Sequence, residues 1–331
     1  MARIVLGMAT SHTPMLNAPP TDWPRFIERD SQRTDLLDVE GRLTSYEQQL
    51  QHAPPGIAAE IAPERMEARH GAVQGAITRL GEFLREARLD ALIVAGDDQE
   101  ELYHHDNMPG ILVYYGETIR NVPLPRPAEP SWGWRASARW HEEKVPRDYP
   151  VDAKLARHLI DELIDREFDV AASAETPDGE GEGHAVGFVH RRIMQDVAQK
   201  TVPIVPVCIN TYYPPNQPTP RRCYRLGQAI RAAIESYPGD ARVGIIASGG
   251  LSHFVVDETL DRGFLDLLRQ KDAAAIQSLP REKLNSGSSE IRNWICVAGA
   301  VEHLSLGWSL YEPGYRTPAG TGTGLGFAFW S

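Results

Sequence analysis

Four short polar segments carry residue types that bind metals or move protons, and each directly follows an apolar run. They are Thr10-Ser11-His12, Asp97-Asp98-Gln99, Asn210–Tyr213 and the stretch from Ser248 to His253. In open α/β sheets, ligands bind beyond the carboxyl ends of the strands. The segments lie far apart along the chain, but one sheet edge would bring them together. We therefore expect a functional site at that edge.

Glu290 and His184 are further candidates, and each also has an ordinary structural interpretation. Glu290 lies in the stretch NSGSSEIRNWI, where we expect Ser288 or Ser289 to cap a helix that runs to Val301. A carboxylate in a first turn commonly just complements the helix dipole. His184 lies in the Gly- and Glu-rich stretch GEGEGHAVGF, where a solvated loop histidine is typical.

Taken together, these residues match a known type of metal site. Two neutral donors and one carboxylate on one face of the metal form the facial triad of non-haem Fe(II) oxygenases, which leaves positions open for substrate and O₂. His12 and Glu290 would supply two of the ligands, and the loop that follows Gly96 would supply the third.

Short β-rich runs that alternate with helical patterns predict an α/β fold, as a single domain over residues 1–331 with a mixed, largely parallel central sheet flanked by helices. The helical patterns cover residues 64–87, 152–166 and 219–236. The expected strands are Arg3–Ala9, Ala91–Gly96, Ile111–Gly116, Asp169–Ala174, Val202–Asn210, Arg242–Ser248 and Gly324–Trp330.

Two Pro-rich segments, residues 15–62 and 117–150, interrupt this alternation. Long irregular inserts in compact domains are usually functional loops or disordered segments. Three tryptophans, Trp132, Trp134 and Trp140, favour a folded lid or an oligomer contact over disorder in the second segment. We expect a homo-oligomer, with a dimer as the simplest form.

The charge and the cysteines narrow the class of protein. The net charge is −11 and no basic run of five or more occurs, which argues against nucleic-acid or anionic-membrane partners. Three widely spaced cysteines form no CxxC pair, so neither a zinc finger nor a disulfide framework is expected. The sequence shows no cleavable leader pattern and no stretch that would span a bilayer, and we expect a cytoplasmic protein.

The chain resembles the LigB-type, or class III, extradiol ring-cleavage dioxygenases. It is most similar to the branch of 3-O-methylgallate dioxygenase and the β subunit of protocatechuate 4,5-dioxygenase. The resemblance covers almost the whole chain. It is carried by GMATSHTPML (7–16), ALIVAGDDQE (91–100), GHAVGFVHRRIM (183–194), NTYYPPNQPTPRRCYRLGQAIRAAIESYP (210–238), SGGLSHF (248–254) and GSSEIRNWI (287–295).

The resemblance implies roles for particular residues. His12 matches the first iron-binding histidine and Glu290 the carboxylate ligand. His253 matches the histidine proposed as the acid/base catalyst, and His184 a histidine that lines the substrate pocket. The chain departs from the family at Gln99, which stands where a second iron-binding histidine is expected.

Several residues could replace that histidine as the third ligand. Gln99 keeps the spacing from the strand end and would bind through its neutral amide oxygen. Asp97 or Asp98 would instead add negative charge, which makes Mn(II) more welcome. His104 or His105 would have to fold back, and a loop that binds no metal is the remaining alternative.

The expected function is the Fe(II)-dependent extradiol cleavage by O₂ of a catechol-type ring, which we expect to be carboxylated and gallate-like. Tyr212 or Tyr213 would contact the substrate. Arg221 and Arg222 are candidate cations for its carboxylate, and a solvated helix start is the equally plain interpretation of these two residues. The rival functions are a metal-dependent hydrolase or other non-oxidative enzyme on the same scaffold, and a metal-free binding protein.

Overall fold

The computed structural model describes residues 1–194 and 201–331, and within them a nine-stranded mixed sheet forms the centre of the molecule. Its strands are β1 (Arg3–Thr10), β2 (Ala91–Gly96), β3 (Ile111–Tyr114), β6 (Ala171–Ser173), β7 (Ile204–Ile209), β8 (Arg242–Ser248), β9 (His253–Val255), β10 (Leu306–Tyr315) and β11 (Thr321–Trp330). Their order is β10-β11-β1-β8-β2-β7-β3-β6, and β9 pairs with β11. The central strands β1, β8, β2 and β7 run parallel, while β10 and β11 form an antiparallel edge. The predicted α/β fold is confirmed.

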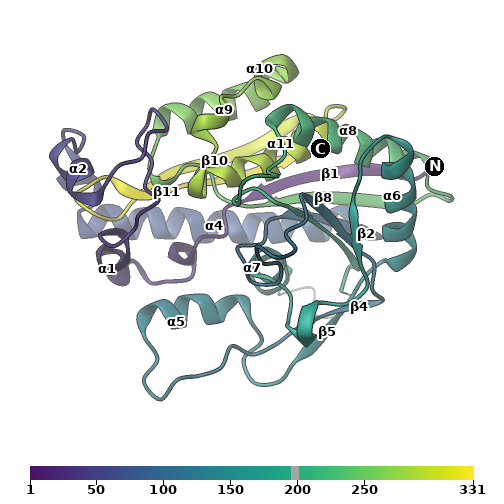
Figure 1. The fold of residues 1–331 in the computed structure, drawn as a ribbon, viewed down its shortest axis with the longest axis horizontal. Helices are drawn as coiled ribbons and strands as arrows, with labels where there is room; N and C mark the ends of the chain where they lie inside the picture. The colour runs from purple at the N-terminus through teal and green to yellow at the C-terminus, as the bar shows by residue number, and fades with distance from the viewer. Residues whose placement is uncertain (195–200) are drawn as a thin grey trace.

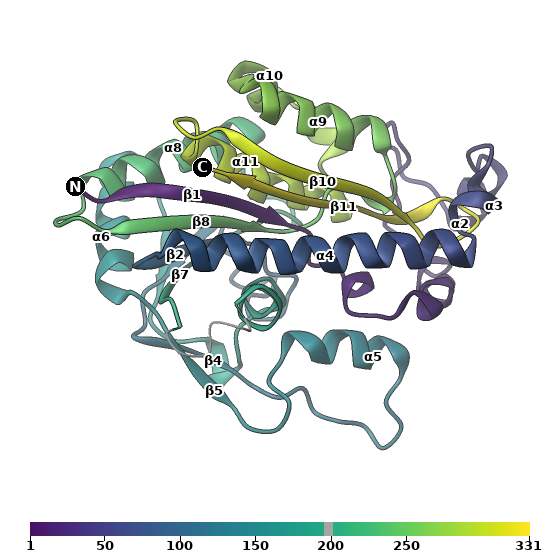
Figure 2. The same cartoon turned by 180° about the vertical axis from the view of Figure 1, so that it is seen from behind.

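Helices cover both faces of the sheet because the buried strands are apolar on both sides. Ile93 of β2 packs into the core under α6 (Ala153–Asp165), α8 (Pro220–Ser236), α9 (Glu258–Gln270), α10 (Ala273–Gln277) and α11 (Ile291–Ala300). Its neighbours Leu92 and Val94 point to the opposite face, under α4 (Pro63–Ala87) and α7 (His184–Phe188). Figures 1 and 2 show α4 along one face and α8 and α11 on the other. In the described residues, no helix combines the length and apolar character needed to cross a membrane.

The sequence predicted most of the sheet but missed four strands. β2 and β8 have the expected bounds, and the other expected strands differ by one to three residues at an end. The missed strands are β9, β10 and the separate hairpin of β4 (Thr118–Asn121) and β5 (Arg147–Pro150). β10 contains Gly307, Pro313 and Gly314, which are typical of turns, and it lies at the edge of the sheet, where such residues are tolerated.

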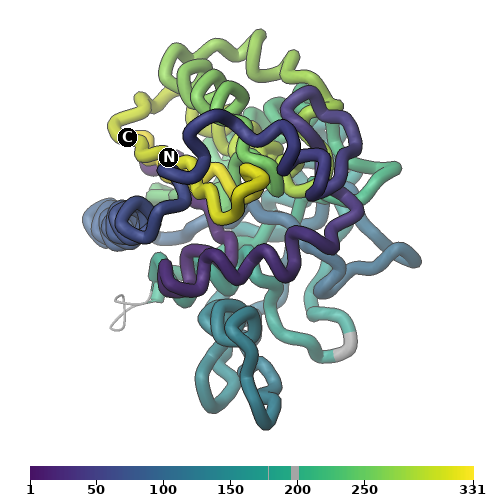
Figure 3. Tube along the Cα trace, turned by 90° about the vertical axis from the view of Figure 1, so that its left-hand side faces the viewer, coloured from purple at the N-terminus to yellow at the C-terminus, as the bar shows by residue number. Residues whose placement is uncertain are grey.

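Both Pro-rich segments are folded and pack against each other. The elements of the first segment are η1 (Pro14–Leu16), η2 (Pro20–Phe26), α1 (Ile27–Asp30), α2 (Tyr46–Gln51) and α3 (Ile57–Glu60). The second segment contains α5 (Trp132–Ser137) and η3 (Ala138–Trp140), which lie between β4 and β5. The rings of Phe26 and Trp132 lie 4.4 Å apart between centroids. Figure 3 shows the second segment beside the first at the periphery of the molecule. A role for either segment as a lid stays a prediction.

Candidate metal centre

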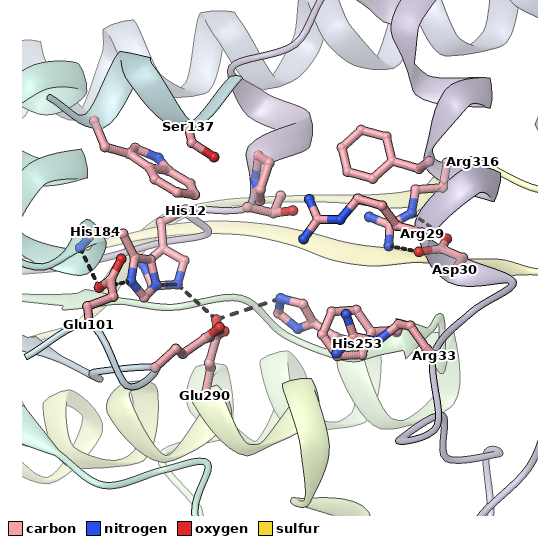
Figure 4. Close-up of a pocket in the computed structure, with 16 residues that line it drawn as sticks. His12, Arg29, Asp30, Arg33, Glu101, Ser137, His184, His253, Glu290 and Arg316 are labelled. Atoms are coloured by element: carbon pink, nitrogen blue, oxygen red, sulfur yellow. Dashed lines mark hydrogen bonds and ion pairs between the residues drawn. The ribbon is translucent and has the colours of Figure 1, made fainter. Parts of the chain in front are cut away.

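The carboxyl ends of β1, β2 and β8 meet at one edge of the sheet, and a group of buried polar side chains gathers beyond it. His12 follows β1 by two residues, and Glu290 directly precedes α11. The Nε2 atom of His12 lies 3.1 Å from the carboxylate of Glu290, and both side chains are only 2% exposed. Figure 4 shows the two side chains pointing toward each other. Two residues from opposite ends of the chain are therefore in contact at one buried site.

The ring of His12 is held through its Nδ1 atom, so that Nε2 points into the site. Its Nδ1 lies 3.1 Å from the hydroxyl of Ser248. That hydroxyl donates its own hydrogen to the carbonyl of Ala185 at 2.8 Å, so its oxygen must accept from Nδ1–H of His12. With hydrogen on Nδ1, Nε2 is the ring atom that remains to bind a metal, and it faces Glu290.

His184 is oriented in the same way by Glu101. The Glu101 carboxylate accepts from Nδ1–H at 2.6 Å and from the backbone N–H of His184 at 2.8 Å. Burial lowers the pKa of His184, but the attraction of Glu101 and its hydrogen bond outweigh this effect and raise the pKa to about 10. The Nε2 atoms of His184 and His12 face each other at 3.2 Å. Since two lone pairs repel at that distance, a proton or a cation must lie between them.

His253 approaches Glu290 from the other side. Its Nδ1–H donates to the carbonyl of Leu251 at 2.8 Å, and its Nε2 lies 3.7 Å from the Glu290 carboxylate. Burial lowers the pKa of His253 despite the opposing attraction of Glu290. A Cβ atom at Gly250 would stand 2.1 Å from the His253 ring, so glycine is required there, and its backbone N–H donates to Glu290.

The predicted cap of α11 by Ser288 or Ser289 is wrong. A 3₁₀ turn, η7 (Ser286–Glu290), precedes the helix, and no side chain caps its first turn. The hydroxyl of Ser288 instead accepts from the backbone N–H of His253 at 2.9 Å and donates to its carbonyl at 2.9 Å. Ser288 therefore ties the segment before α11 to the strand that carries His253.

Asp97 and Glu290 place two carboxyl groups at the same buried site, and Gln99 joins them. The side-chain amide of Gln99 donates to Glu290 at 2.9 Å and to Asp97 at 3.3 Å, and that of Asn293 donates to Asp97 at 3.0 Å. Burial, followed by repulsion from Glu290, raises the pKa of Asp97 to about 6. Burial also raises the pKa of Glu290, but attraction to His253 and His12 outweighs it and lowers that pKa.

This donor set fits a divalent metal ion. One ligand atom each from His12, Asp97 and His184 can be chosen so that all lie within 4.8 Å of one another, and all three residues are buried. Two nitrogens bound to one ion at about 2.1 Å and at right angles stand about 3.0 Å apart, close to the separation of the two Nε2 atoms. Among the described residues, no lysine or arginine forms an ion pair with Asp97 or Glu290. A cation would therefore supply charge that the site lacks.

The candidate ligands open into a cavity of about 240 Å³. His12, Gln99, His184, His253 and Glu290 line one end. The remaining wall comes largely from the two Pro-rich segments and includes the aromatic rings of Phe26 and Trp140 and the guanidinium groups of Arg29, Arg33 and Arg316. The cavity therefore has metal-binding groups at one end, and both aromatic rings and guanidinium groups along the rest of its wall.

The other candidates for the third ligand lie outside this group. The carboxylate of Asp98 accepts from the backbone N–H groups of Leu102 and Tyr103 at 3.0 and 3.1 Å and so shapes the loop. His104 and His105 are exposed. The structure thus leaves Gln99 and Asp97 at the site and adds His184, which the sequence suggested only as a pocket residue.

The tyrosines and arginines considered for substrate binding do not line the cavity. Tyr212 donates to Asp35 and accepts from Arg33 at 3.3 Å, so its nearest link to the cavity passes through Arg33. Tyr213 packs beside Tyr212 with 4.9 Å between ring centroids. A substrate contact by either tyrosine stays a prediction. The structure favours the alternative interpretation of the two arginines as a solvated helix start, because Arg222 stacks on Phe168 and Arg221 is exposed on the surface.

Sequence reasoning missed Glu101 and Asn293, which orient His184 and Asp97. Glu101 lies only two positions after Gln99, in the stretch DDQEEL, but nothing in a single sequence links it to His184. Asn293 lies one helical turn after Glu290, which is the spacing that places two side chains on one helix face. That spacing could have indicated from the sequence that Asn293 lies at the same site as Glu290.

Comparisons with known proteins identify a matching family and two similar proteins. The sequence model of a family described as the catalytic LigB subunit of aromatic ring-opening dioxygenase matches residues 48–323. A gallate dioxygenase of Pseudomonas putida is 33% identical over 190 residues, which cover 54% of this chain and 54% of that protein. A 2,3-dihydroxyphenylpropionate/2,3-dihydroxicinnamic acid 1,2-dioxygenase of Comamonas testosteroni is 33% identical over 103 residues, or 31% of this chain and 30% of that protein. The chain thus spans about half the length of the first relative and less than a third of the second.

Proposed function

We propose that the protein is an Fe(II)-dependent extradiol dioxygenase that cleaves a catechol-type ring with O₂. The chain belongs to the family of catalytic LigB subunits of aromatic ring-opening dioxygenases, which supports this proposal. The observation that carries this proposal is the buried contact between His12 and Glu290 beside the two imidazoles of His184 and His253. His12 lies before the matched range, so its place in the site comes from the fold and not from the match.

The proposed ligands are His12, Glu290 and His184. Histidines that bind metals usually donate their other ring N–H to a carboxylate or similar acceptor, and Glu101 provides that acceptor for His184. Asp97 stands close enough to bind as well. Gln99, predicted from its position in the sequence, is the alternative third ligand, because its amide lies between the two carboxylates and could turn its oxygen toward an ion.

A bound Fe(II) ion would lower the pKa of a catechol hydroxyl and keep coordination positions open for both the diol and O₂. The protein would supply the proton transfer. His253 is buried, its Nδ1–H is fixed on a carbonyl, and its Nε2 faces the site, so the neutral ring can accept the proton of a diol hydroxyl. The rings of Phe26 and Trp140 would exclude water and hold the aromatic ring.

We also propose a substrate class, an oligomeric state and a location. The names of both relatives refer to aromatic acids, which supports a carboxylated, gallate-like substrate. A homodimer and a cytoplasmic location stay predictions; the three cysteines are free, as a reducing compartment would require.

The test is to load the protein with Fe(II) without air, add gallate or 3,4-dihydroxybenzoate, and then admit O₂. We expect one O₂ consumed per diol and a yellow ring-fission product. The variants His12→Ala and Glu290→Ala should lose both metal binding and turnover, while His52→Ala, which removes an exposed histidine, should keep them.

Other outcomes would select the rival functions. Tight binding of zinc without O₂ uptake on any diol would indicate a metal-dependent hydrolase or another non-oxidative enzyme. Calorimetry that detects no affinity for any divalent metal would indicate a metal-free binding protein and would contradict the proposal.

A further inference from the structure

The cavity has two ends of different charge. One end holds the candidate metal ligands, and the other is lined by three guanidinium groups, Arg29, Arg33 and Arg316. Figure 4 shows these arginines on the side of the pocket away from His184 and Glu101. Such an arrangement selects a molecule with a metal-binding group at one end and negative charge at the other.

Two of the three arginines are already neutralised by carboxylates of the protein. Buried Arg316 forms a two-pronged ion pair with Asp30 at 2.8 and 2.7 Å. Arg33 forms a similar pair with Asp35 at 2.9 and 2.8 Å and stacks on the ring of Phe254. These pairs fix the wall of the cavity but leave no free positive charge.

Arg29 is the unpaired cation of the group. Among the described residues, no hydrogen bond or ion pair joins its guanidinium to another side chain, and the residue keeps an exposed surface. Partial burial lowers the pKa of Arg29, repulsion from Arg316 and Arg33 lowers it further, and attraction to Asp30 opposes them. In Figure 4, the Arg29 side chain extends into the pocket, between the Arg316–Asp30 pair and His12.

We propose that Arg29 binds the carboxylate of an aromatic diol acid and thereby determines the specificity of the site for anionic rings. This inference rests on the proposed function and names the residue that reads the charge of the substrate. A planar guanidinium binds a carboxylate through two parallel hydrogen bonds, which also fixes the direction of the ring. The diol would then point toward the metal end of the same cavity.

Arg29 lies outside the part of the chain that matches the family. Arg29 and Arg33 belong to the first Pro-rich segment and lie before residue 48, where the match to the family begins. The recognition of the acid group would therefore be a property of this N-terminal segment and not of the matched part of the chain.

The test compares 3,4-dihydroxybenzoate with its uncharged amide, 3,4-dihydroxybenzamide, on the Fe(II)-loaded protein. Binding is measured without O₂, so that no turnover occurs, and kcat/KM is measured with O₂. A charge-assisted hydrogen bond contributes about 1.5–3 kcal/mol, so Arg29→Met should weaken binding of the acid by roughly 10- to 150-fold and leave the amide within about threefold. Arg29→Lys should recover part of the loss.

The matched control is Arg25→Met, which removes an arginine of the same segment that is paired with Asp22 and Glu28 and does not line the cavity. It should leave the preference for the acid unchanged. An Arg29→Met variant that keeps the wild-type ratio of acid to amide would overturn the inference, as would a wild-type protein that binds both compounds equally or binds neither. Binding of the acid without ring cleavage would instead contradict the proposed function and leave the role of Arg29 supported.

Discussion

The carboxyl group of Asp261, on α9, is fully buried beside Ser252, the residue before His253. One of its oxygens accepts from the backbone N–H of Ser252 at 2.8 Å, and the other accepts from the hydroxyls of Ser252 and Tyr311 at 2.7 and 2.8 Å. Burial raises the pKa of Asp261 to about 7, against the hydrogen bonds from Ser252 and Tyr311, which lower it. The group therefore holds a proton in the folded protein at pH values where the unfolded chain has lost it.

This difference makes the stability of the protein depend on pH with a definite sign. Between the ordinary pKa of 3.8 and the folded value of about 7, the native state binds more protons than the unfolded state, so the free energy of unfolding falls as the pH rises. About two pH units of this window lie above pH 5, and each unit corresponds to 1.36 kcal/mol. The titration of Asp261 should therefore lower the free energy of unfolding by about 3 kcal/mol between pH 5 and pH 8.5.

The variant Asp261→Asn has no such titration. Urea unfolding of the iron-free wild type and variant, followed by tryptophan fluorescence, should show the difference between them shifting by about 3 kcal/mol in favour of the variant as the pH rises from 5 to 8.5. Asp266→Asn, which changes an exposed aspartate of the same helix, should show almost no shift. A difference for Asp261→Asn that stays constant over this range would refute the reasoning.

Three further predictions concern the metal ligands and the cavity wall. In anaerobic calorimetry with Fe(II), His184→Ala should weaken metal binding more than Gln99→Ala does, and the reverse order would make Gln99 the third ligand. Glu101→Gln should weaken Fe(II) binding by about 10- to 100-fold without unfolding the protein, because it removes the carboxylate that orients His184, and unchanged affinity would contradict that role. Arg316→Met should lower the free energy of unfolding by about 3–5 kcal/mol, since it leaves Asp30 buried without its partner. Adding Asp30→Asn should restore part of this loss. Equal stability of Arg316→Met and the wild type would contradict a stabilising role for the ion pair.

The positions that follow strand ends could be read from the sequence. The apolar runs predicted to end at Ala9, Gly96 and Ser248 are parallel neighbours in the sheet, and parallel strands deliver their following residues to one edge. That rule was enough to bring His12, Gln99 and His253 to one place. Glu290 was harder to assign, because a carboxylate at the start of a helix has an ordinary explanation without a metal; only its combination with the other candidates indicated a metal site.

The residues that orient and complete the site could not be read in this way. Glu101 acts on His184 across 83 positions of sequence, and Arg29 reaches the cavity from an insert whose path no periodicity specifies. The cations proposed from the sequence, Arg221 and Arg222, were chosen for their place near a motif, whereas the cavity is lined by arginines of other segments. Contacts of this kind depend on tertiary packing, which local patterns do not encode.

The central claim is that His12 and Glu290 hold one iron ion together with His184, with room beside it for an aromatic diol. A crystal structure of the Fe(II)-loaded protein, grown and frozen without O₂ and with anomalous scattering measured at the iron edge, tests it most directly. The account predicts one iron peak bonded to Nε2 of His12 and to the carboxylate of Glu290, with His253 beside it but not bonded. A peak elsewhere, or an ion that touches only one of these two residues, would contradict it.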